Sequence, residues 1–528
     1  MRRALLFAFS CLSACSSAAP APPHESNASA TALLAPSLRR LSVAELSAAA
    51  SSIAGQSVEL EPALPPDARQ YDFSRSLTQS VDALTLKQLT SATRDLAQRL
   101  DLGSPSLPAC AKSAASDDAA CRAELIRSLA SKAFRHEPSD AELVSLDKVF
   151  SAGASGATFR DGAMLVMRAL LGSSELLYET SFGSQASDLK IALTDDELAS
   201  QLAWLIAGTP PDAELRRAAT SGELRSGAER QRQAERLLGD SASRYLYRRF
   251  IEEWLGLNRL RSLAKSSAVA PDFAELREPM LRETEAFIDD AMVTSGGALA
   301  QLFAGSYSIV PSELANFYGI VAPAAGQRVS LAKLGRVGLL QQASFLATFA
   351  HEDGSAPVLR GKAVLERLLC RQLPKPSELG IDLVLPPPNP NATTRERFAL
   401  HAQESRCAGC HDSLDGAGFS FENFDAVGRA RSTEAGKPVD TSGHLVVDGS
   451  DMPLKNSMDL AYAIAGSDAL ASCAARQVVR FAAGSENPDV EADFVQATRA
   501  LPPPERNSIL GLFLAYVRGD WFAWRAQP

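Results

Sequence analysis

Three residues in the C-terminal part of the chain have types and a spacing that could do chemistry. Cys407, Cys410 and His411 form a C-x-x-C-H sequence. Two thiols at this spacing can form thioethers with the two vinyl groups of one porphyrin, and the histidine that follows can bind the iron. The arrangement therefore predicts covalent haem c, with His411 as the proximal iron ligand.

Two other kinds of site fit the same three residues. Cys407 and Cys410 could form a short disulfide beside an ordinary histidine. A zinc site is the other alternative, and it would need a fourth ligand, for which Cys370 or Cys473 is available. The sequence leaves both alternatives open.

A haem iron in an electron-transfer protein commonly has a second axial ligand downstream of the motif. Met452, which precedes a proline, is the candidate distal ligand, because a methionine thioether stabilises reduced iron. Met458 and His444 are the alternatives. The competing interpretation is that Met452 is a loop methionine that fills a gap and does not bind iron.

Other clusters of polar residues give weaker signals. His351, Glu352 and Asp353 are consecutive, but their spacing matches no helical metal motif such as H-E-x-x-H, so we expect a polar loop there. No glycine-rich phosphate loop and no G-x-S-x-G nucleophile motif occurs. No catalytic residue is therefore assigned, and whether the protein is an enzyme stays open.

Two carboxylates follow the motif at helical spacing. Glu422 and Asp425 are three residues apart, and Arg429 and Arg431 come shortly after them. Carboxylates in such a setting cap backbone amides or pair with arginines more often than they act as a catalytic pair. We expect a structural role for both.

The N-terminus has the pattern of an export signal. Arg2 and Arg3 precede an apolar run, 4–9, that is far shorter than the ~20 residues needed to cross a bilayer. The residues before Cys15 resemble the lipobox of bacterial lipoproteins, which predicts a signal peptide over 1–15 and lipidation of Cys15. Ser16, in place of aspartate, favours the outer membrane, and 16–40 is expected to be a flexible tether.

Export to an oxidising compartment favours disulfides. Of the eight cysteines, two belong to the signal peptide and the lipid anchor, and two belong to the C-x-x-C-H motif. The other four can make two disulfides. Cys110 and Cys121 are neighbours in sequence and the simplest pair, which leaves Cys370 to pair with Cys473.

The composition bounds the fold class and the partners. The chain has 53 Lys and Arg against 62 Asp and Glu, and a net charge of −9 gives no basic surface for nucleic acid. Ala and Leu predominate and strand alternation does not persist, so we predict a mainly α protein. Two capping boxes, Ser139 with Glu142 and Thr194 with Glu197, mark helix starts. Further helices are expected at 158–179, 227–256, 276–295, 331–348, 457–466 and 472–483.

A proline-rich stretch, 373–390, is the clearest boundary, because prolines remove backbone donors and favour extended chain. We predict a multi-helical body before it and a small helical domain like a c-type cytochrome after it. The expected divisions are 41–188, 189–322, 323–372, a strap at 373–392, and 393–528.

Several segments, in order, carry a family resemblance. They include "LASKAFRHEPSDAELVSL", "LTDDELASQLAWLIAG", "LGRVGLLQQASFLATFA" and "CAGCHDSLDGAGFSFENFDAVGRAR". Together they resemble the multi-domain planctomycete surface-domain proteins, which are cytochrome-c-like exported proteins of unknown function found in planctomycetes and myxobacteria. The resemblance implies an architecture and an exported context, but no settled reaction.

The function expected from these observations is electron transfer or redox chemistry by an outer-membrane lipoprotein. Its partners would be the membrane, through the lipid, and a redox partner protein. The alternative is a cofactor-free surface binding or scaffold protein with a Cys407–Cys410 disulfide. An oxidoreductase with an open iron position is a third hypothesis.

Overall fold

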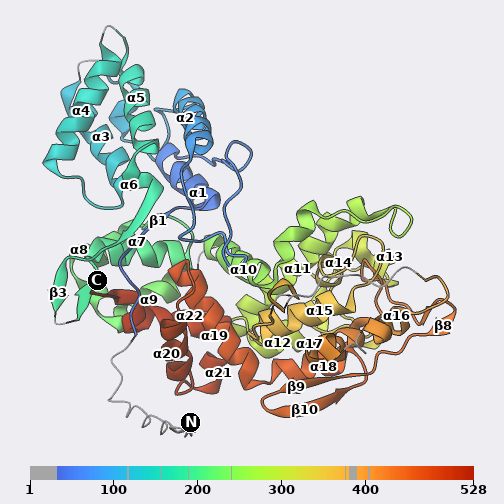
Figure 1. The fold of residues 1–528 in the computed structure, drawn as a ribbon. Coiled ribbons are helices and arrows are strands. Elements are labelled where there is room, and N and C mark those ends of the chain that lie inside the picture. Colours follow the sequence, from blue (N-terminus) through green and yellow to red (C-terminus); the bar gives the residue numbers. More distant parts are fainter. Residues whose placement is uncertain are drawn as a thin grey trace, which may run out of the picture.

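The computed structural model describes residues 32–527, except 116–117, 156, 188, 240, 375, 380–388 and 402–404. The protein is mainly α, as predicted, with short strands between the helices (Figure 1). The predicted signal peptide, Cys15 and most of the tether lie outside the described residues, as does much of the proline-rich strap. In the part of the chain that is described, no helix has the length and apolar character needed to span a membrane.

The N-terminal helices pack around one hydrophobic core of their own, which runs from Leu41 to Trp204. Strands β1 (Ser37–Arg40) and β2 (Tyr178–Ser181) pair antiparallel at its base. Figure 1 shows this group, in blue and cyan, at one end of the molecule. Its helices are α1 (Val43–Ala54), α2 (Ala83–Gln98), α3 (Ala119–Phe134), α4 (Asp140–Ala154), α5 (Phe159–Leu171) and α6 (Ser174–Leu177).

Local capping signals place two helix starts where the sequence predicts them. Ser139 accepts a hydrogen bond from the Glu142 amide at the start of α4, and the Glu142 side chain accepts one from the Ser139 amide. Thr194 and Glu197 make the same reciprocal pair at the start of α7 (Asp195–Ile206). Both capping boxes are confirmed, because each depends only on residues three apart.

The central helices surround a larger core and contribute to a smaller one that runs from Leu260 to Val427. They are α7, α8 (Ala213–Thr220), α9 (Gly227–Leu238), α10 (Ser241–Leu255), α11 (Phe273–Ser295), α12 (Leu299–Ala304), α13 (Ala315–Tyr318), α14 (Ala343–Thr348) and α15 (Pro357–Ala363). Two short antiparallel strand pairs interrupt the helical pattern, β5 (Tyr307–Ile309) with β6 (Arg328–Ser330), and β7 (Thr433–Glu434) with β8 (Lys437–Pro438).

Three predicted helices are shorter than expected. The helix over 158–179 ends at Leu171, after which α6 and β2 begin. The helix over 227–256 is divided into α9 and α10. Over 331–348 only α14 is an α-helix, because Gly335 and Gly338 have positive φ values of 73° and 55°, and the chain there forms short 3₁₀ turns.

The C-terminal segment returns to the central core. Its elements are α16 (Thr394–His401), α17 (Ser405–Gly418), β9 (Gly443–Val447), β10 (Ser450–Leu454), α18 (Ser457–Ala465), α19 (Asp468–Ala483), α20 (Pro488–Thr498), α21 (Pro503–Arg506), α22 (Ile509–Arg518), α23 (Asp520–Ala523) and β11 (Trp524–Ala526).

Packing at the C-terminus joins distant parts of the chain. Strand β11 pairs with β4 (Lys190–Ala192), which also pairs with β3 (Gln185–Ser187). One hydrophobic core extends from Leu34 to Ala523, so α19 and α22 share it with the central helices. Figure 1 shows α22, in red, beside α9. The predicted domain boundaries stay a prediction.

Both predicted disulfides are present. Cys110 bonds to Cys121, with Cα atoms 5.8 Å apart. Cys370 bonds to Cys473, with Cα atoms 5.3 Å apart and a sequence separation of 103. The second disulfide ties the chain just before the proline-rich strap to α19.

Candidate functional site

Helix α17 carries the whole C-x-x-C-H motif. Cys407, Cys410 and His411 lie within Ser405–Gly418. Positions i, i+3 and i+4 of a helix share one face, so the motif residues belong to the same side of α17. The side chains of the two cysteines lie outside what the structure describes. Of the three motif residues, His411 is therefore the one whose side-chain contacts are described.

Glycines allow α15 to lie very close to α17. A Cβ atom on Gly361 of α15 would lie 2.0 Å from the Leu414 carbonyl oxygen, and one on Gly418 would lie 2.0 Å from the Pro357 carbonyl oxygen. Real side chains do not tolerate such distances to backbone atoms. The backbone of α15 therefore lies directly against the backbone of α17 (Figure 1).

A second pair of glycines brings strand β9 onto the same helix. A Cβ atom on Gly443 would lie 2.0 Å from the Gly416 carbonyl oxygen, and one on Gly416 would lie 2.6 Å from the His444 carbonyl oxygen. Helix α17 is therefore fixed between α15 and the β9–β10 hairpin. The element that carries the motif is set by tight backbone packing.

His411 is largely buried and faces a carboxylate one turn along the helix. Its side chain is 14% exposed, and Nδ1 lies 3.2 Å and 3.3 Å from the two carboxylate oxygens of Asp415. An ionised carboxylate only accepts hydrogen bonds, so this contact places the ring proton on Nδ1. In that tautomer Nε2 has the lone pair that a metal ligand needs.

A buried ion network supports the helices on either side of the motif. Glu422, 2% exposed, accepts hydrogen bonds from Arg431 at 2.8 Å and from the Ser355 hydroxyl at 2.9 Å. Arg431 also contacts Glu434 at 3.1 Å, and Glu434 accepts from the Thr394 amide at 2.8 Å at the start of α16. The predicted pairing of Glu422 with an arginine is confirmed.

Asp425 caps a turn in the same region. Its Oδ1 atom accepts hydrogen bonds from the amides of Val427 at 2.9 Å and Arg429 at 2.8 Å. The Arg429 guanidinium pairs with Asp272 instead, at 2.7 Å. The predicted structural role is confirmed, although Asp425 caps backbone amides and does not pair with an arginine side chain.

Of the three distal-ligand candidates, Met452 and His444 lie on the β9–β10 hairpin, and Met458 lies in α18. Met452 of β10 is opposite Leu445 and is 40% exposed. His444 of β9 lies against α17, with Nε2 3.5 Å from Asp412 and Nδ1 2.9 Å from Asp451. The hydrogen bond that His444 donates to Asp451 raises the pKa of His444. The distal role of Met452 stays a prediction.

The polar loop around His351 lines a cavity of about 940 Å³. Arg397 and Phe398 of α16 form part of the same wall, so the cavity lies beside the helix that precedes the motif. Burial lowers the pKa of His351. The sequence predicts the loop but not the cavity, whose walls come from distant segments.

Neither of the cysteines considered as a fourth zinc ligand is available. Cys370 and Cys473 are bonded to each other, so neither thiol is available to a metal. Among the described residues, no group of three or more His, Cys, Asp or Glu side chains could hold a metal ion.

Sequence reasoning missed two features that the structure brings out. Asp415 stands four residues after His411, a spacing that places two helical side chains on one face and could have indicated the contact. The β9–β10 hairpin has Asp448 and Gly449 at its turn, both with positive φ, and Asp-Gly is a strong hairpin signal.

Comparison with known families agrees with the resemblance seen in the sequence. Residues 121–180 match PSD5, described as a protein of unknown function (DUF1595), and residues 193–320 match PSD4, a protein of unknown function (DUF1592). Residues 336–434, which include the C-x-x-C-H motif, match PSCyt3, a protein of unknown function (DUF1588). The chain belongs to the planctomycete-type multi-domain proteins of unknown function.

Within this family, the PSCyt3 name indicates a cytochrome-c-like domain, and the matched segment contains α15, α16 and α17. No curated protein and no solved structure matches the chain significantly. The family gives no reaction, so a function has to be argued from the residues of the site.

Proposed function

We propose that the protein is an exported electron-transfer lipoprotein with a covalently attached c-type haem. Cys407 and Cys410 would form the thioethers, and His411 would be the proximal ligand. The contact between His411 Nδ1 and Asp415 is the observation that carries the proposal, because iron-bound histidines almost always donate their other ring N–H to such a partner.

The described residues fit this role. The three motif positions share one face of α17, and the tautomer that Asp415 selects has its lone pair on Nε2. Haem bound here would supply one-electron transfer. Asp415 would hold the imidazole in a fixed orientation, and the close packing of α15 and β9 on α17 would keep the ligand in place.

Met452 is the proposed distal ligand. It lies on β10, in a hairpin whose other strand packs against α17. Methionine ligation would favour the reduced iron and so raise the reduction potential. Replacement of Met452 by alanine should remove the methionine–iron charge-transfer absorption, whereas replacement of Met458 should leave it. Loss of this absorption in both variants, or in neither, would contradict the assignment.

The cellular context is part of the proposal. A lipid on Cys15 would anchor the protein to the outer membrane, and 16–40 would separate the anchor from the helical body. A redox partner protein would exchange electrons with the haem. Labelling with a radioactive fatty acid should modify the full-length protein and not a Cys15→Ala variant.

The experiment for the haem is expression in a host that has thioether-forming haem machinery. The purified protein should give the pyridine haemochrome spectrum of haem c, and a Cys407→Ala, Cys410→Ala variant should not. A colourless folded product whose peptide map contains a Cys407–Cys410 disulfide would instead support a cofactor-free scaffold protein.

A further inference from the structure

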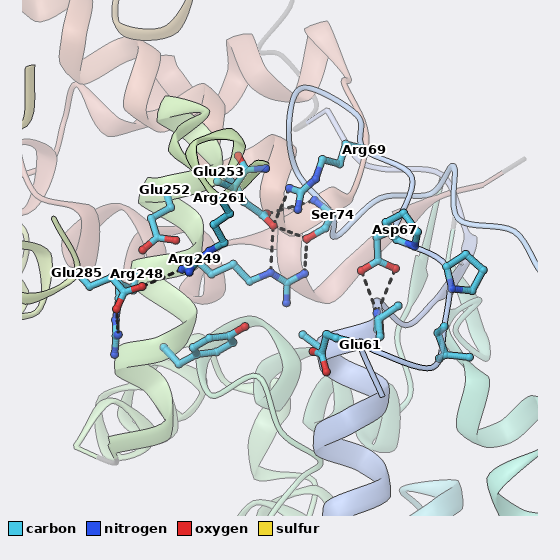
Figure 2. Close-up of a pocket in the computed structure, with 17 residues that line it drawn as sticks. Glu61, Asp67, Arg69, Ser74, Arg248, Arg249, Glu252, Glu253, Arg261 and Glu285 are labelled. Atoms are coloured by element: carbon cyan, nitrogen blue, oxygen red, sulfur yellow. Dashed lines mark hydrogen bonds and ion pairs between the residues drawn. The ribbon is translucent and has the colours of Figure 1, made fainter. Parts of the chain in front are cut away.

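A second cavity, of about 440 Å³, lies where the N-terminal helical group meets α10 and α11. Figure 2 shows Glu252 on the same side as Arg248 and Glu285, with Glu61 and Asp67 across from them. The walls come from 43–74 and from 245–285, so none of them belongs to the segment with the C-x-x-C-H motif.

The arginines of this cavity are already paired. Arg69 and Arg249 contact Glu253 at 3.0 Å and 3.3 Å. Arg248 and Arg261 contact Glu285 at 3.1 Å and 3.0 Å. An anionic ligand would therefore have to compete with carboxylates that the protein itself supplies.

Two further carboxylates also have partners. Glu61 accepts a hydrogen bond from the Ser47 hydroxyl at 3.0 Å. Asp67 accepts from the Val43 amide at 3.0 Å. Every carboxylate of the cavity wall except Glu252 thus has a hydrogen-bond or ion-pair partner in the described part of the chain.

Glu252 differs from the others. It is only 8% exposed, and its Oε1 atom is buried with no hydrogen-bond partner among the described residues. Burial, followed by repulsion from Glu285, raises the pKa of Glu252 to about 7. An ionised carboxylate in such a place is costly unless a cation compensates it.

The cavity also has an apolar side. Tyr245 stands seven residues before Glu252, which is about two turns along α10 and on the same face. Leu64, Pro65 and Pro66 contribute apolar surface from the N-terminal loop. A ligand with a cationic head and a small apolar body would meet complementary groups at both ends.

We propose that this cavity binds a small organic cation through an ammonium group, with Glu252 as its counter-ion. A bound ammonium would neutralise the carboxylate whose Oε1 atom has no hydrogen-bond partner among the described residues, and the ligand body would pack against Tyr245 and the two prolines. A neutral polyol would leave that carboxylate uncompensated. The site is a binding site separate from the proposed haem, and its test does not require haem.

Cation binding would be coupled to loss of a proton. Below about pH 7 Glu252 is protonated, and a cation must displace that proton to form the ion pair. The charged groups that act on Glu252 are Glu285 from α11, Arg261 from the segment after α10, and Arg248 and Glu253 from α10 itself. Glu61, Asp67, Arg69 and Arg249 also line the cavity.

The test is calorimetric titration of the full chain with 2-phenylethylamine in phosphate buffer, with 2-phenylethanol as the uncharged match. The amine should bind, and the alcohol should not bind with comparable affinity. Lowering the pH from 8 to 6 should weaken amine binding about tenfold, because each pH unit below the pKa costs about tenfold.

Two variants make the result specific. Glu252→Gln keeps the side-chain shape and should weaken amine binding roughly 30-fold or more, and it should remove the pH dependence. Glu275→Gln, an exposed carboxylate outside the cavity, should bind like the wild type. The proposal is overturned if the amine does not bind the wild type, if the alcohol binds equally well, or if folded Glu252→Gln binds as tightly as the wild type.

Discussion

The Nδ1 atom of His411 lies 3.2 Å from a carboxylate oxygen of Asp415, one turn further along α17. The contact makes the imidazole a stronger donor to a metal, because the carboxylate withdraws the Nδ1 proton partly from the ring. Asp415 is itself buried and only 8% exposed. The reduction potential of the proposed haem should therefore depend on Asp415.

The first prediction concerns that dependence. Replacement of Asp415 by asparagine should leave haem attached but raise its reduction potential, because a neutral amide makes His411 a weaker donor to oxidised iron. Potentiometric titration followed by absorbance measures the change. Asp412→Asn is the matched control, since Asp412 is next to His411 and 74% exposed. An unchanged potential in Asp415→Asn, or an equal shift in both variants, would contradict the role of Asp415.

The second prediction concerns the Cys370–Cys473 disulfide. Replacing both cysteines by serine should lower the free energy of unfolding by up to about 4–5 kcal/mol, because the bond closes a long loop in the unfolded chain. Removing Cys110–Cys121, whose residues are 11 apart, should cost less, about 3 kcal/mol. Chemical denaturation of both double variants gives the comparison. A larger loss for the short loop would count against the chain-entropy explanation.

The third prediction concerns the close contact of α15 with α17. Gly361→Ala should destabilise the protein by roughly 1–3 kcal/mol, since the new Cβ meets a backbone carbonyl that must move. Gly466→Ala, where nothing lies within 4 Å of a Cβ atom, is the control. Urea unfolding of the two variants measures the difference. Equal stability of both would mean that the helices can separate without cost.

The fourth prediction concerns a buried glutamate of α11. Glu283 is 0% exposed and accepts hydrogen bonds from the Tyr318 hydroxyl at 2.5 Å and from the Ser308 hydroxyl at 2.7 Å. Burial raises its pKa from 4.5 to about 7. Between pH 4.5 and about pH 7, the Glu283 carboxyl group is therefore protonated in the folded state and ionised in the unfolded state. Stability from this group is complete below pH 4.5 and is lost as the pH rises to about 7.

The loss amounts to roughly 3 kcal/mol over that pH range, at about 1.4 kcal/mol for each unit of pKa difference. In Glu283→Gln this contribution is absent, so the free energy of unfolding should vary less with pH than in the wild type. Glu278→Gln, on the same helix and 61% exposed, is the control. Urea unfolding at several pH values tests the prediction, and identical pH profiles for wild type and Glu283→Gln would refute it.

Features that depend on neighbouring residues could be predicted from the sequence. The capping boxes at Ser139 and Thr194 are examples, since each needs a partner only three residues away. The disulfides could be predicted by counting cysteines, because two pairs remained. The helix expected over 331–348 was wrong, since glycines with positive φ at 335 and 338 override the apolar spacing.

Features that depend on long-range packing could not be predicted. The walls of the cavity around Glu252 come from 43–74 and 245–285, and nothing local to Glu252 indicates that its Oε1 atom has no hydrogen-bond partner among the described residues. The pairing of β11 with β4, which returns the C-terminus to the central helices, is equally non-local. The expected chemistry of the motif follows from its residue types. The packing of α15 and β9 against α17 could not be predicted, because it joins segments that are distant in sequence.

The proposed electron-transfer function depends on covalent attachment of haem to Cys407 and Cys410. The most direct measurement is a haem stain after denaturing electrophoresis of protein made in a host with haem-attachment machinery. Thioether-bound haem stays with the polypeptide under these conditions, so we expect a stained band at the full chain mass and none for the Cys407→Ala, Cys410→Ala variant. An unstained band from folded wild-type protein, with its Cys407–Cys410 disulfide recovered by peptide mapping, would contradict it.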